Sequence, residues 1–512
     1  MTRSFNLRRH TESAQLESRR HFLRMSGGCA ALSSTALLSQ MLNLRLTQSV
    51  AAQTSGGGDY KALVCLFLLG GNDSYNMLTP YDTSEYNDYV TARTGLALSK
   101  SDTTGNDGEV IPGLLPIDAG NGRQLGIHGN MPELRDMYNN GDAAFVANVG
   151  SLVVPITIEN FLTAQKPLGL YSHSDLQQHW QSSIPQSRSQ TSGWGGRMAD
   201  ILNATYGGTS NVSMNIALDQ LNLFQTGSDV VPYVVNRNGA SVLNGYLETP
   251  TNGQGWNRDR IRSRFLNSIF PSTSDSELGT LYQDLLQRSI AKSGRISIDA
   301  ANQFNEATAP PPEGDFSTPF PDTALGDRLK LVASAIRGRS VLAQDRQVFF
   351  VTEGGWDHHA TLVDTQRPKL ETVSQALNAF IAAMKEINMH DSVVTFTASD
   401  FARTLNSNGS GSDHAWGGNH LILGGSVAGG QVYGTYPETL IPHTAQTPNP
   451  LDLGRGRLIP TMSVDEYAAE IAMWFGIPND QNLEDILPNV RQFFSAGGTT
   501  GPLGCLTGGS AT

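Results

Sequence analysis

Histidine and carboxylate side chains gather in three short blocks in the second half of the chain. The blocks are Gly354–His359, Ser399–Thr404 and Asp413–His420, and they hold four of the eleven histidines. Imidazoles and carboxylates without thiolates are typical ligands of divalent ions such as zinc, manganese or magnesium. The residue types therefore predict a metal centre, and hydrolysis is the leading chemistry for such a centre.

Several candidate ligands follow predicted buried strands: Asp73 after Lys61–Leu69, Asp357 after Arg346–Thr352, and Asp400 after Ser392–Thr397. In open α/β sheets, ligands bind outside the carboxyl ends of the strands, so these side chains are expected to meet at one edge. Asp357 and His359 are two residues apart and leave an extended loop on the same face. Asp413 and His414 need a turn to converge, which the surrounding glycines permit. For any single aspartate the alternative role is to cap the next helix.

A candidate nucleophile lies earlier in the chain, at Ser172. If a helix opens at His173, the Ser172 hydroxyl lies at the helix N-cap, where free N–H groups and the helix dipole would stabilise an alkoxide or a bound anion. His173 would then serve as a supporting group or a general acid. A plain capping serine is the alternative interpretation. His128 and His179 are interpreted as surface or packing residues.

Apolar runs alternate with helical patterns between residues 53 and 505, which favours one large α/β unit followed by a flexible tail at 506–512. Two further strands are predicted, Ala143–Val149 and Leu421–Gly424, the second beginning just after His420. The predicted helices are Met131–Asn140, Gly195–Tyr206, Thr323–Ala343, Pro368–Asn388 and a last one before Gly476, which Ser463 caps together with Glu466.

Residues 250–320 interrupt this alternation. They contain a turn rich in Gly and Asn, two helical segments at about Arg258–Ile269 and Ser276–Ala291, and the proline-rich loop Ala309–Gly314. We interpret the stretch as a helical insertion that caps the edge of the sheet.

The N-terminus resembles an export signal. The arginine pair Arg19 and Arg20 precedes a modestly apolar run, Cys29–Leu42, which is typical of a twin-arginine signal. The run is too short and too rich in serine for a spanning helix. A basic leader with a chance arginine pair is the alternative.

Small residues at Val50–Ala52 predict cleavage there, so residues 1–52 are predicted to be a signal peptide. The mature protein is then periplasmic or secreted, and the twin-arginine machinery is an expected partner. That machinery carries folded proteins, so a metal ion could be loaded before export.

The mature chain is strongly acidic. Removing residues 1–52 leaves 28 basic and 45 acidic side chains, a formal net charge of −17 compared with −12 for the whole chain. This charge argues against nucleic acid and anionic membranes as partners. No second apolar segment is long enough to span a bilayer. Only Cys65 and Cys505 remain after cleavage, and we expect no disulfide between them.

The blocks occur in a recognisable series. Together with Leu69–Asp73, Ser172–Gln177 and Gly193–Arg197, they resemble the DUF1501 family of exported bacterial proteins, a branch of the alkaline phosphatase-like and sulfatase-like superfamily. The resemblance implies a doubly wound, mostly parallel sheet with helices on both faces. It also implies one or two divalent ions (zinc, manganese, magnesium or calcium) and Ser172 as nucleophile. The implied metal ligands are Asp73, Asp357, His359, Asp400, Asp413, His414 and His420.

These observations lead to one functional expectation and one alternative. We expect an exported metal-dependent hydrolase of small or polymer-borne phosphate or sulfate esters, in which Ser172 attacks the ester. The alternative is an exported, non-catalytic protein of the cell envelope that keeps its metal for stability. An open coordination position would favour the enzyme, and a closed one would favour the binding protein.

Overall fold

A computed structural model describes residues 60–105, 108–242, 258–282 and 284–507. The chain divides into two compact units, a larger one of Leu46–Ala240 with Asp299–Thr512 and a smaller one that contains Ser241–Ile298. The predicted signal peptide lies outside the described residues. Within the described ranges, no helix combines the length and apolarity that crossing a membrane requires.

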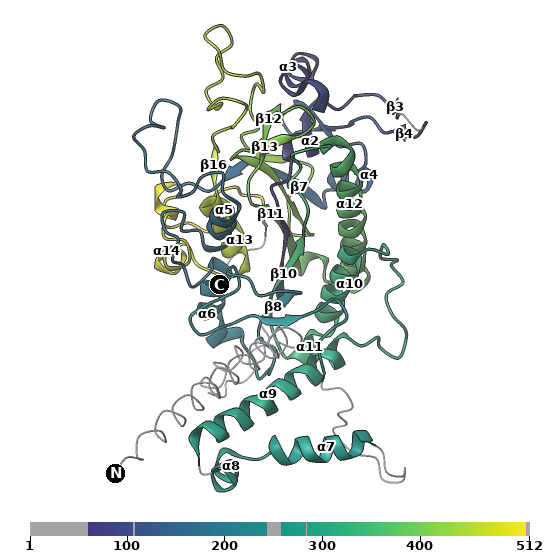
Figure 1. Cartoon of the computed structure of the whole chain (residues 1–512), viewed down its shortest axis with the longest axis vertical. Helices are drawn as coiled ribbons and strands as arrows, with labels where there is room; N and C mark the ends of the chain where they lie inside the picture. The colour runs from purple at the N-terminus through teal and green to yellow at the C-terminus, as the bar shows by residue number, and fades with distance from the viewer. Residues whose placement is uncertain (1–59, 106–107, 243–257, 283, 508–512) are drawn as a thin grey trace, which may run out of the picture. The chain divides into compact units, whose positions relative to one another are not determined.

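The larger unit is built on a nine-stranded sheet (Figure 1). The strands lie in the order β15-β7-β14-β11-β1-β10-β8-β9, and β16 also pairs with β7. All pairings are parallel except the two made by β14, which is antiparallel to β11 and to β7. The bounds are β1 Lys61–Leu68, β7 Ala143–Gly150, β8 Asn215–Leu218, β9 Tyr233–Val235, β10 Arg346–Glu353, β11 Val393–Ser399, β14 Gly418–Leu423, β15 Val432–Gly434 and β16 Met462–Ser463.

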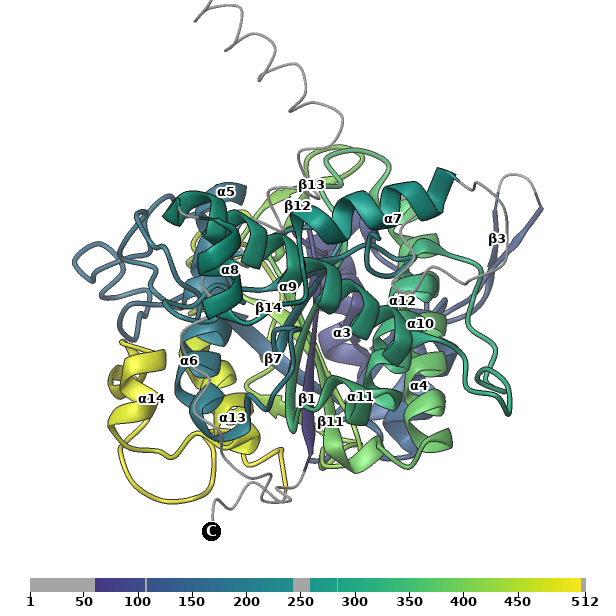
Figure 2. The same ribbon diagram turned by 90° about the horizontal axis from the view of Figure 1, so that it is seen from below.

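Helices cover both faces of this sheet, because successive side chains of its buried strands point to opposite sides. In β1, Val64 and Leu66 belong to one apolar core, whereas Cys65 and Phe67 belong to the other. Figures 1 and 2 show the helices of the two layers on either side of the strands. The first layer contains α4 (Pro132–Asn139), α10 (Ala324–Arg337), α11 (Arg339–Leu342) and α12 (Leu362–Glu386), and the second contains α5 (His173–Ser182), α6 (Trp194–Tyr206), α13 (Val464–Phe475) and α14 (Gln481–Ile486).

Smaller elements surround the upper end of the sheet in Figure 1. Two of them form the hairpin β12–β13, in which Arg403 pairs with His414. The hairpin strands are β12 (Arg403–Ser407) and β13 (Ser412–His414). The other small elements are α2 (Ser74–Met77), β2 (Leu78–Pro80), α3 (Thr83–Arg93), β3 (Thr103–Thr104), β4 (Val110–Ile111), β5 (Leu115–Asp118) and β6 (Gln124–Ile127).

The described part of the smaller unit is helical. The prediction of a helix at Arg258–Ile269 is confirmed as α7. The second predicted helix, Ser276–Ala291, is wrong as a single element, since α8 (Asp275–Leu281) and α9 (Leu285–Thr308) replace it. The break has a local cause, because the Asp284 carboxylate accepts hydrogen bonds from the N–H groups of Leu286 and Gln287 and starts the new helix.

The predicted α/β architecture with a large, mostly parallel sheet is confirmed, but three details differ. Helix α12 begins at Leu362, so Pro368 lies inside it rather than at its start. The predicted helix Thr323–Ala343 is interrupted at Gly338, where a Cβ atom would lie 2.0 Å from the Ala307 carbonyl oxygen. His420 lies within β14 instead of before it, because the strand pairs with β7 from Gly418 onward.

Candidate metal centre

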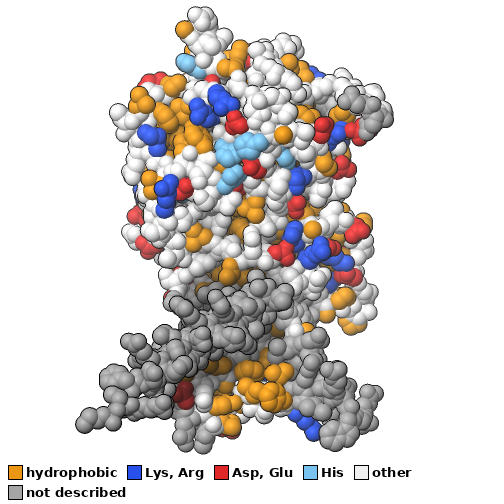
Figure 3. Space-filling view, viewed as in Figure 1, with side chains coloured by type: hydrophobic (Ala, Val, Ile, Leu, Met, Phe, Trp, Pro, Cys, Tyr) orange, Lys and Arg blue, Asp and Glu red, His pale blue; other side chains and the backbone are white. Residues whose placement is uncertain are grey.

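Three side chains form a compact cluster beyond the carboxyl ends of β1, β10 and β11. One ligand atom each of His173, Asp357 and His414 lies within 4.8 Å of the others, and the described residues contain no other group of this kind. His359 joins them, with its Nε2 atom 2.9 Å from Asp357 Oδ1 and 3.0 Å from His414 Nε2. In Figure 3 the histidines form a patch around a carboxylate on the molecular surface.

Three separate segments supply these four residues. Asp357 and His359 follow β10, His414 ends β13, and His173 is the first residue of α5. The loop after β1 supports the arrangement through Gly70, whose φ is +120° and where a Cβ atom would lie 2.6 Å from the Asp357 nitrogen. A residue with a side chain would therefore push the β10 loop, and Asp357 with it, out of place.

Each imidazole of the cluster is held through its Nδ1 atom. His173 Nδ1 lies 2.7 Å from Asp400 Oδ2, His414 Nδ1 lies 2.8 Å from the Tyr171 carbonyl oxygen, and His359 Nδ1 lies 3.3 Å from Asp413 Oδ1. Carboxylate and carbonyl oxygens accept hydrogen bonds, so Nδ1 carries the proton in the neutral ring. The Nε2 lone pairs are consequently left for a ligand.

The three Nε2 atoms converge on the Asp357 carboxylate. They lie 3.5 Å (His173), 3.3 Å (His414) and 2.9 Å (His359) from its oxygens. Neutral imidazole nitrogens with their lone pairs turned together repel unless a proton or a cation lies between them. Ligands of a tetrahedral zinc ion stand about 3.3 Å apart, given zinc–nitrogen bonds of about 2.0 to 2.1 Å. The donor set thus fits one divalent ion, and hydrogen-bonded Nδ1 atoms are the usual support of metal-binding histidines.

The surroundings of Asp357 and His414 favour the protonation states in which these side chains bind metals. Burial raises the pKa of Asp357, but the Arg403 guanidinium, whose Nη1 lies 2.8 Å from Oδ1, outweighs burial and holds that pKa below its usual value. Burial lowers the pKa of His414, so this ring is neutral at pH 7. An ionised carboxylate and a neutral imidazole are the forms that bind metals.

Asp400, predicted as a ligand, lies behind the cluster instead. It is fully buried, and its Oδ2 atom accepts hydrogen bonds from His173 Nδ1 and Gln177 Nε2, both at 2.7 Å. Its Oδ1 atom accepts one from the Gly70 N–H at 3.1 Å. Because protein donors engage both oxygens, Asp400 orients His173.

Asp413 holds a similar position behind His359. Its Oδ1 atom faces His359 Nδ1 and the Asn408 amide, and its Oδ2 atom accepts from Arg455 Nη2 at 2.5 Å. The Asn408 hydrogen bond and the Arg455 charge hold the pKa of Asp413 below its usual value. Asp413 therefore stays ionised and supports the ring of His359.

Two other predicted ligands are not brought to the cluster. Asp73 is fully buried and forms an ion pair with Arg93, which also donates to the Thr404 carbonyl oxygen. His420 is buried in β14, with its ring centroid 4.6 Å from that of Trp180, and burial lowers its pKa to about 3. Its neutral ring serves the packing of the core.

Ser172 lies at the N-cap of α5, as predicted, next to His173 in the chain. Its Oγ atom lies 3.2 Å from Ser174 Oγ and hydrogen-bonds to the Asp175 carboxylate, and it makes no capping bond to the helix backbone. In this rotamer the hydroxyl faces the first turn of the helix.

Sequence reasoning gave no role to three residues that shape the cluster. Arg403 lies within Ser399–Thr404 and Gln177 within Ser172–Gln177, so their proximity in sequence to candidate site residues could have indicated a role. The contribution of Tyr171 comes from its backbone carbonyl group, which residue type does not reveal. Its φ of +75° is uncommon for a residue with a side chain and aims that carbonyl at His414.

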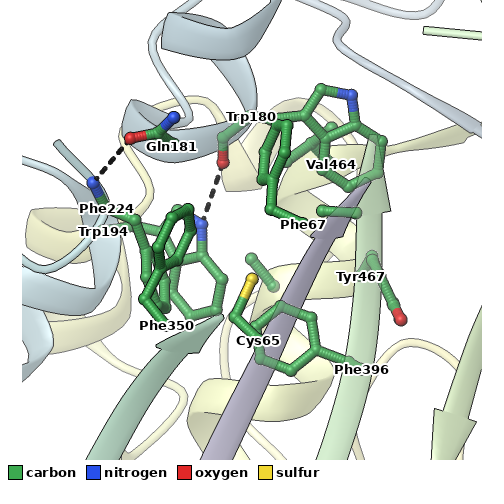
Figure 4. A pocket seen from close by; sticks show the side chains of 12 residues that line it. Cys65, Phe67, Trp180, Gln181, Trp194, Phe224, Phe350, Phe396, Val464 and Tyr467 are labelled. Carbon is green, nitrogen blue, oxygen red and sulfur yellow. Dashed lines mark hydrogen bonds between the residues drawn. The ribbon is translucent and has the colours of Figure 1, made fainter. Parts of the chain in front are cut away.

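An apolar cavity lies deeper in the core, between α5 and the strands (Figure 4). Aromatic rings form most of its wall, and Trp194 Nε1 donates to the Trp180 carbonyl oxygen at 3.1 Å. Its volume of about 10 Å³ is close to that of one water-sized sphere. The cavity is therefore a packing feature and offers no room for a substrate.

Comparison with known proteins identifies the family. Residues 60–487 match the family described as "Protein of unknown function (DUF1501)". The chain belongs to the DUF1501 family. No curated protein matches the sequence.

Two solved structures are similar to the DUF1501 chain. The crystal structure of PsFucS1 sulfatase from Pseudoalteromonas sp. shows 10% identity and a TM-score of 0.28, over 78% of this chain and 68% of that chain. The crystal structure of the lipoteichoic acid synthase LtaP from Listeria monocytogenes shows 9% identity and a TM-score of 0.26, over 76% and 71%.

Proposed function

We propose that this DUF1501 protein is an exported, metal-dependent hydrolase of phosphate or sulfate esters with an alkaline phosphatase-like fold. The observation that carries the proposal is the convergence of three Nδ1-supported imidazoles on Asp357 at the sheet edge where α/β proteins bind ligands. The cluster is partly open, with side-chain exposures of 33% for His173, 46% for His359 and 43% for Asp357. A substrate can therefore reach it.

One divalent ion fits the described donors, and His173, Asp357, His359 and His414 would hold it. Zinc suits a set rich in imidazole. When bound, such an ion polarises the ester oxygens and disperses the charge that develops on them. Asp400, Asp413 and the Tyr171 carbonyl group keep the rings oriented, so little reorganisation is needed when ligands bind.

Ser172 is the proposed nucleophile. It precedes the ligand His173, and the free N–H groups at the start of α5 favour an anion beside it. Its hydroxyl would rotate away from Ser174 to reach an ester held at the cluster. Attack forms a bond from Oγ to phosphorus or sulfur and breaks the bond to the alcohol oxygen, which takes up the proton that the Ser172 hydroxyl loses. Water then cleaves the bond to Oγ, which releases the acid and restores the hydroxyl.

The test uses the purified mature protein. Elemental analysis should find one divalent ion per chain, and chromogenic phosphate and sulfate esters should be hydrolysed only while that ion is bound. His359→Ala should lose the ion and the activity. His390→Ala is the matched control, because His390 also pairs with a carboxylate, Asp142, at 2.9 Å, but before the amino end of β11. A protein without metal and without hydrolysis of any ester would contradict the proposal.

A further inference from the structure

Three successive residues beside the cluster adopt left-handed backbone conformations. They are Gly454 (φ +96°), Arg455 (φ +66°) and Gly456 (φ +70°). Glycine tolerates such angles, but arginine rarely adopts them. Residues held in sparsely populated conformations persist where the surrounding structure fixes them, and they gather at functional sites.

The surroundings fix this loop firmly. Asp452 is buried, and its Oδ1 atom accepts hydrogen bonds from the N–H groups of Gly454 at 2.8 Å and Gly456 at 2.9 Å. The Leu405 N–H donates to the Gly456 carbonyl oxygen at 3.2 Å. A Cβ atom at Gly456 would lie 2.3 Å from Leu405 Cβ, so only glycine permits the approach. The loop is thus attached to β12, the strand that begins with Arg403.

Arg455 reaches from this loop to the rim of the cluster. Its Nη2 donates to Asp413 Oδ2 at 2.5 Å, and the other oxygen of Asp413 supports His359. In the described part of the chain, Asp413 is the only hydrogen-bond partner of this guanidinium, whose side chain is 56% exposed. Its remaining N–H donors are therefore available to a ligand at the cluster.

Arg457 stands close by on the same loop. Its guanidinium lies 5.3 Å from the ring centroid of Tyr171, the residue whose carbonyl group holds His414. Each arginine therefore contacts a residue that supports one imidazole. Basic side chains also lie close to the histidine patch in Figure 3.

The two arginines of this rim contrast with the acidic character of the whole chain, which has a formal net charge of −12. A planar guanidinium group can donate two parallel, charge-assisted hydrogen bonds to two oxygens of a phosphate or sulfate group. A neutral ester would gain nothing from them. Two cations held beside a metal centre by a fixed loop therefore indicate selection for an anionic substrate.

We propose that Arg455, with Arg457 beside it, binds the anionic oxygens of the substrate and restricts the site to esters that carry negative charge. This inference rests on the proposed function. Asp413 places Arg455, and the ligand takes up its free donors. Arg455 is then a specificity residue, distinct from the groups that hold the ion.

The experiment measures how inorganic phosphate and inorganic sulfate protect the metal-loaded protein from thermal unfolding. Arg455→Gln should raise the half-saturating anion concentration about tenfold or more, since it removes charge-assisted hydrogen bonds to the anion. Its metal content should stay at the wild-type level. Arg455→Lys should give a half-saturating concentration between those of the wild type and Arg455→Gln. Lysine keeps the positive charge but lacks the planar guanidinium group that donates two parallel hydrogen bonds.

Arg237→Gln is the matched control, because Arg237 is 50% exposed and pairs with a carboxylate, that of Asp327, but follows β9, two strands from β10 in the sheet. It should bind both anions as the wild type does. Equal anion affinity in the wild type and Arg455→Gln, no protection of the wild type by either anion, or loss of metal from Arg455→Gln would each overturn the inference. Protection that depends on Arg455 in a protein that hydrolyses no ester would refute the proposed function alone.

Discussion

The histidines of the cluster and those of the core beneath α5 show opposite uses of one side chain. In the cluster, His173, His359 and His414 are partly exposed, and their Nδ1 atoms face oxygen acceptors. In the core, both ring nitrogens of His179 are buried without a protein partner among the described residues, and His420 packs against Trp180. Orientation and access therefore separate the candidate ligand histidines from the packing histidines, and residue type does not.

The pKa values of the two core histidines are consistent with a packing role. Burial lowers the pKa of His179 to about 4 and that of His420 to about 3. These rings are neutral in the folded protein at pH 7 and pack as aromatic groups. In the cluster, by contrast, the Nδ1 atoms face oxygen acceptors and the Nε2 atoms turn toward the Asp357 carboxylate.

The largest effect is expected from His414→Ala. Removing one converging nitrogen should abolish stoichiometric metal binding and reduce ester hydrolysis to background. His420→Phe should keep both, with a stability loss of about 1 to 2 kcal/mol from an imperfect fit in the core. Elemental analysis and a chromogenic ester assay measure the two variants side by side. Metal loss from His420→Phe with retention in His414→Ala would reverse the comparison.

The next effect concerns the nucleophile. Ser172→Ala should lower turnover by about 10³-fold or more while metal content stays at the wild-type level. Stability should change by less than about 1 kcal/mol, because the Ser172 hydroxyl makes no capping bond. Ser174→Ala is the control, since it removes the exposed hydroxyl that Ser172 contacts. Unchanged turnover in Ser172→Ala would remove Ser172 from the mechanism and leave a metal hydrolase without a serine nucleophile.

A smaller effect is expected at Asp400, which supports the candidate ligand His173. Asp400→Asn keeps the shape of the side chain but weakens its hold on His173, so metal affinity or activity should fall by about 10- to 100-fold. A titration with zinc against a competing chelator gives the affinity. Complete loss of metal, as expected for His414→Ala, would return Asp400 to the role of ligand that the sequence predicted.

Much of the architecture could be predicted from the sequence, because buried strands and amphipathic helices leave periodic patterns. Strands β1, β7, β10 and β11 were predicted to within about two residues at each end, and the capping box of Ser463 and Glu466 is present. The missed boundary at His420 has a physical reason. A strand buried by its neighbours can carry Asn419 and His420 in its interior, and these polar residues hid its start.

The candidate site was predicted in outline for a related reason. Loops after parallel strands meet at one edge, so Asp357 and His359 could be placed there from their position after β10. His414 ends the hairpin strand β13, so it was grouped with them by residue type. The sequence did not show which of the predicted ligands face the ion and which support a neighbouring side chain. Whether a carboxylate faces an ion or a neighbouring N–H depends on side-chain direction, and Asp73 and Asp400 both point to protein partners. Arg455 gave no signal beyond its two glycine neighbours.

The smallest predicted effect is a change in acid stability that comes from a histidine of the core. The pKa of His420 is about 3 in the folded protein and about 6.5 when unfolded. The unfolded chain therefore binds more protons between these values, so the His420 contribution to stability is complete above pH 6.5 and is lost as pH falls toward 3. At pH 5 the loss should reach up to about 2 kcal/mol. His420→Phe has no ring to protonate and should lack this part of the loss.

Urea unfolding of wild type and His420→Phe at pH 7.5 and pH 5 measures the effect. A chelator is present throughout, so that acid release of metal from the cluster does not contribute. The other buried histidines titrate equally in both proteins and cancel in the difference. The stability gap between the two proteins should therefore move in favour of the variant at pH 5. If the gap stays constant, the His420 ring is not held neutral by burial, and its assignment to the core rather than to the metal would lose its electrostatic basis.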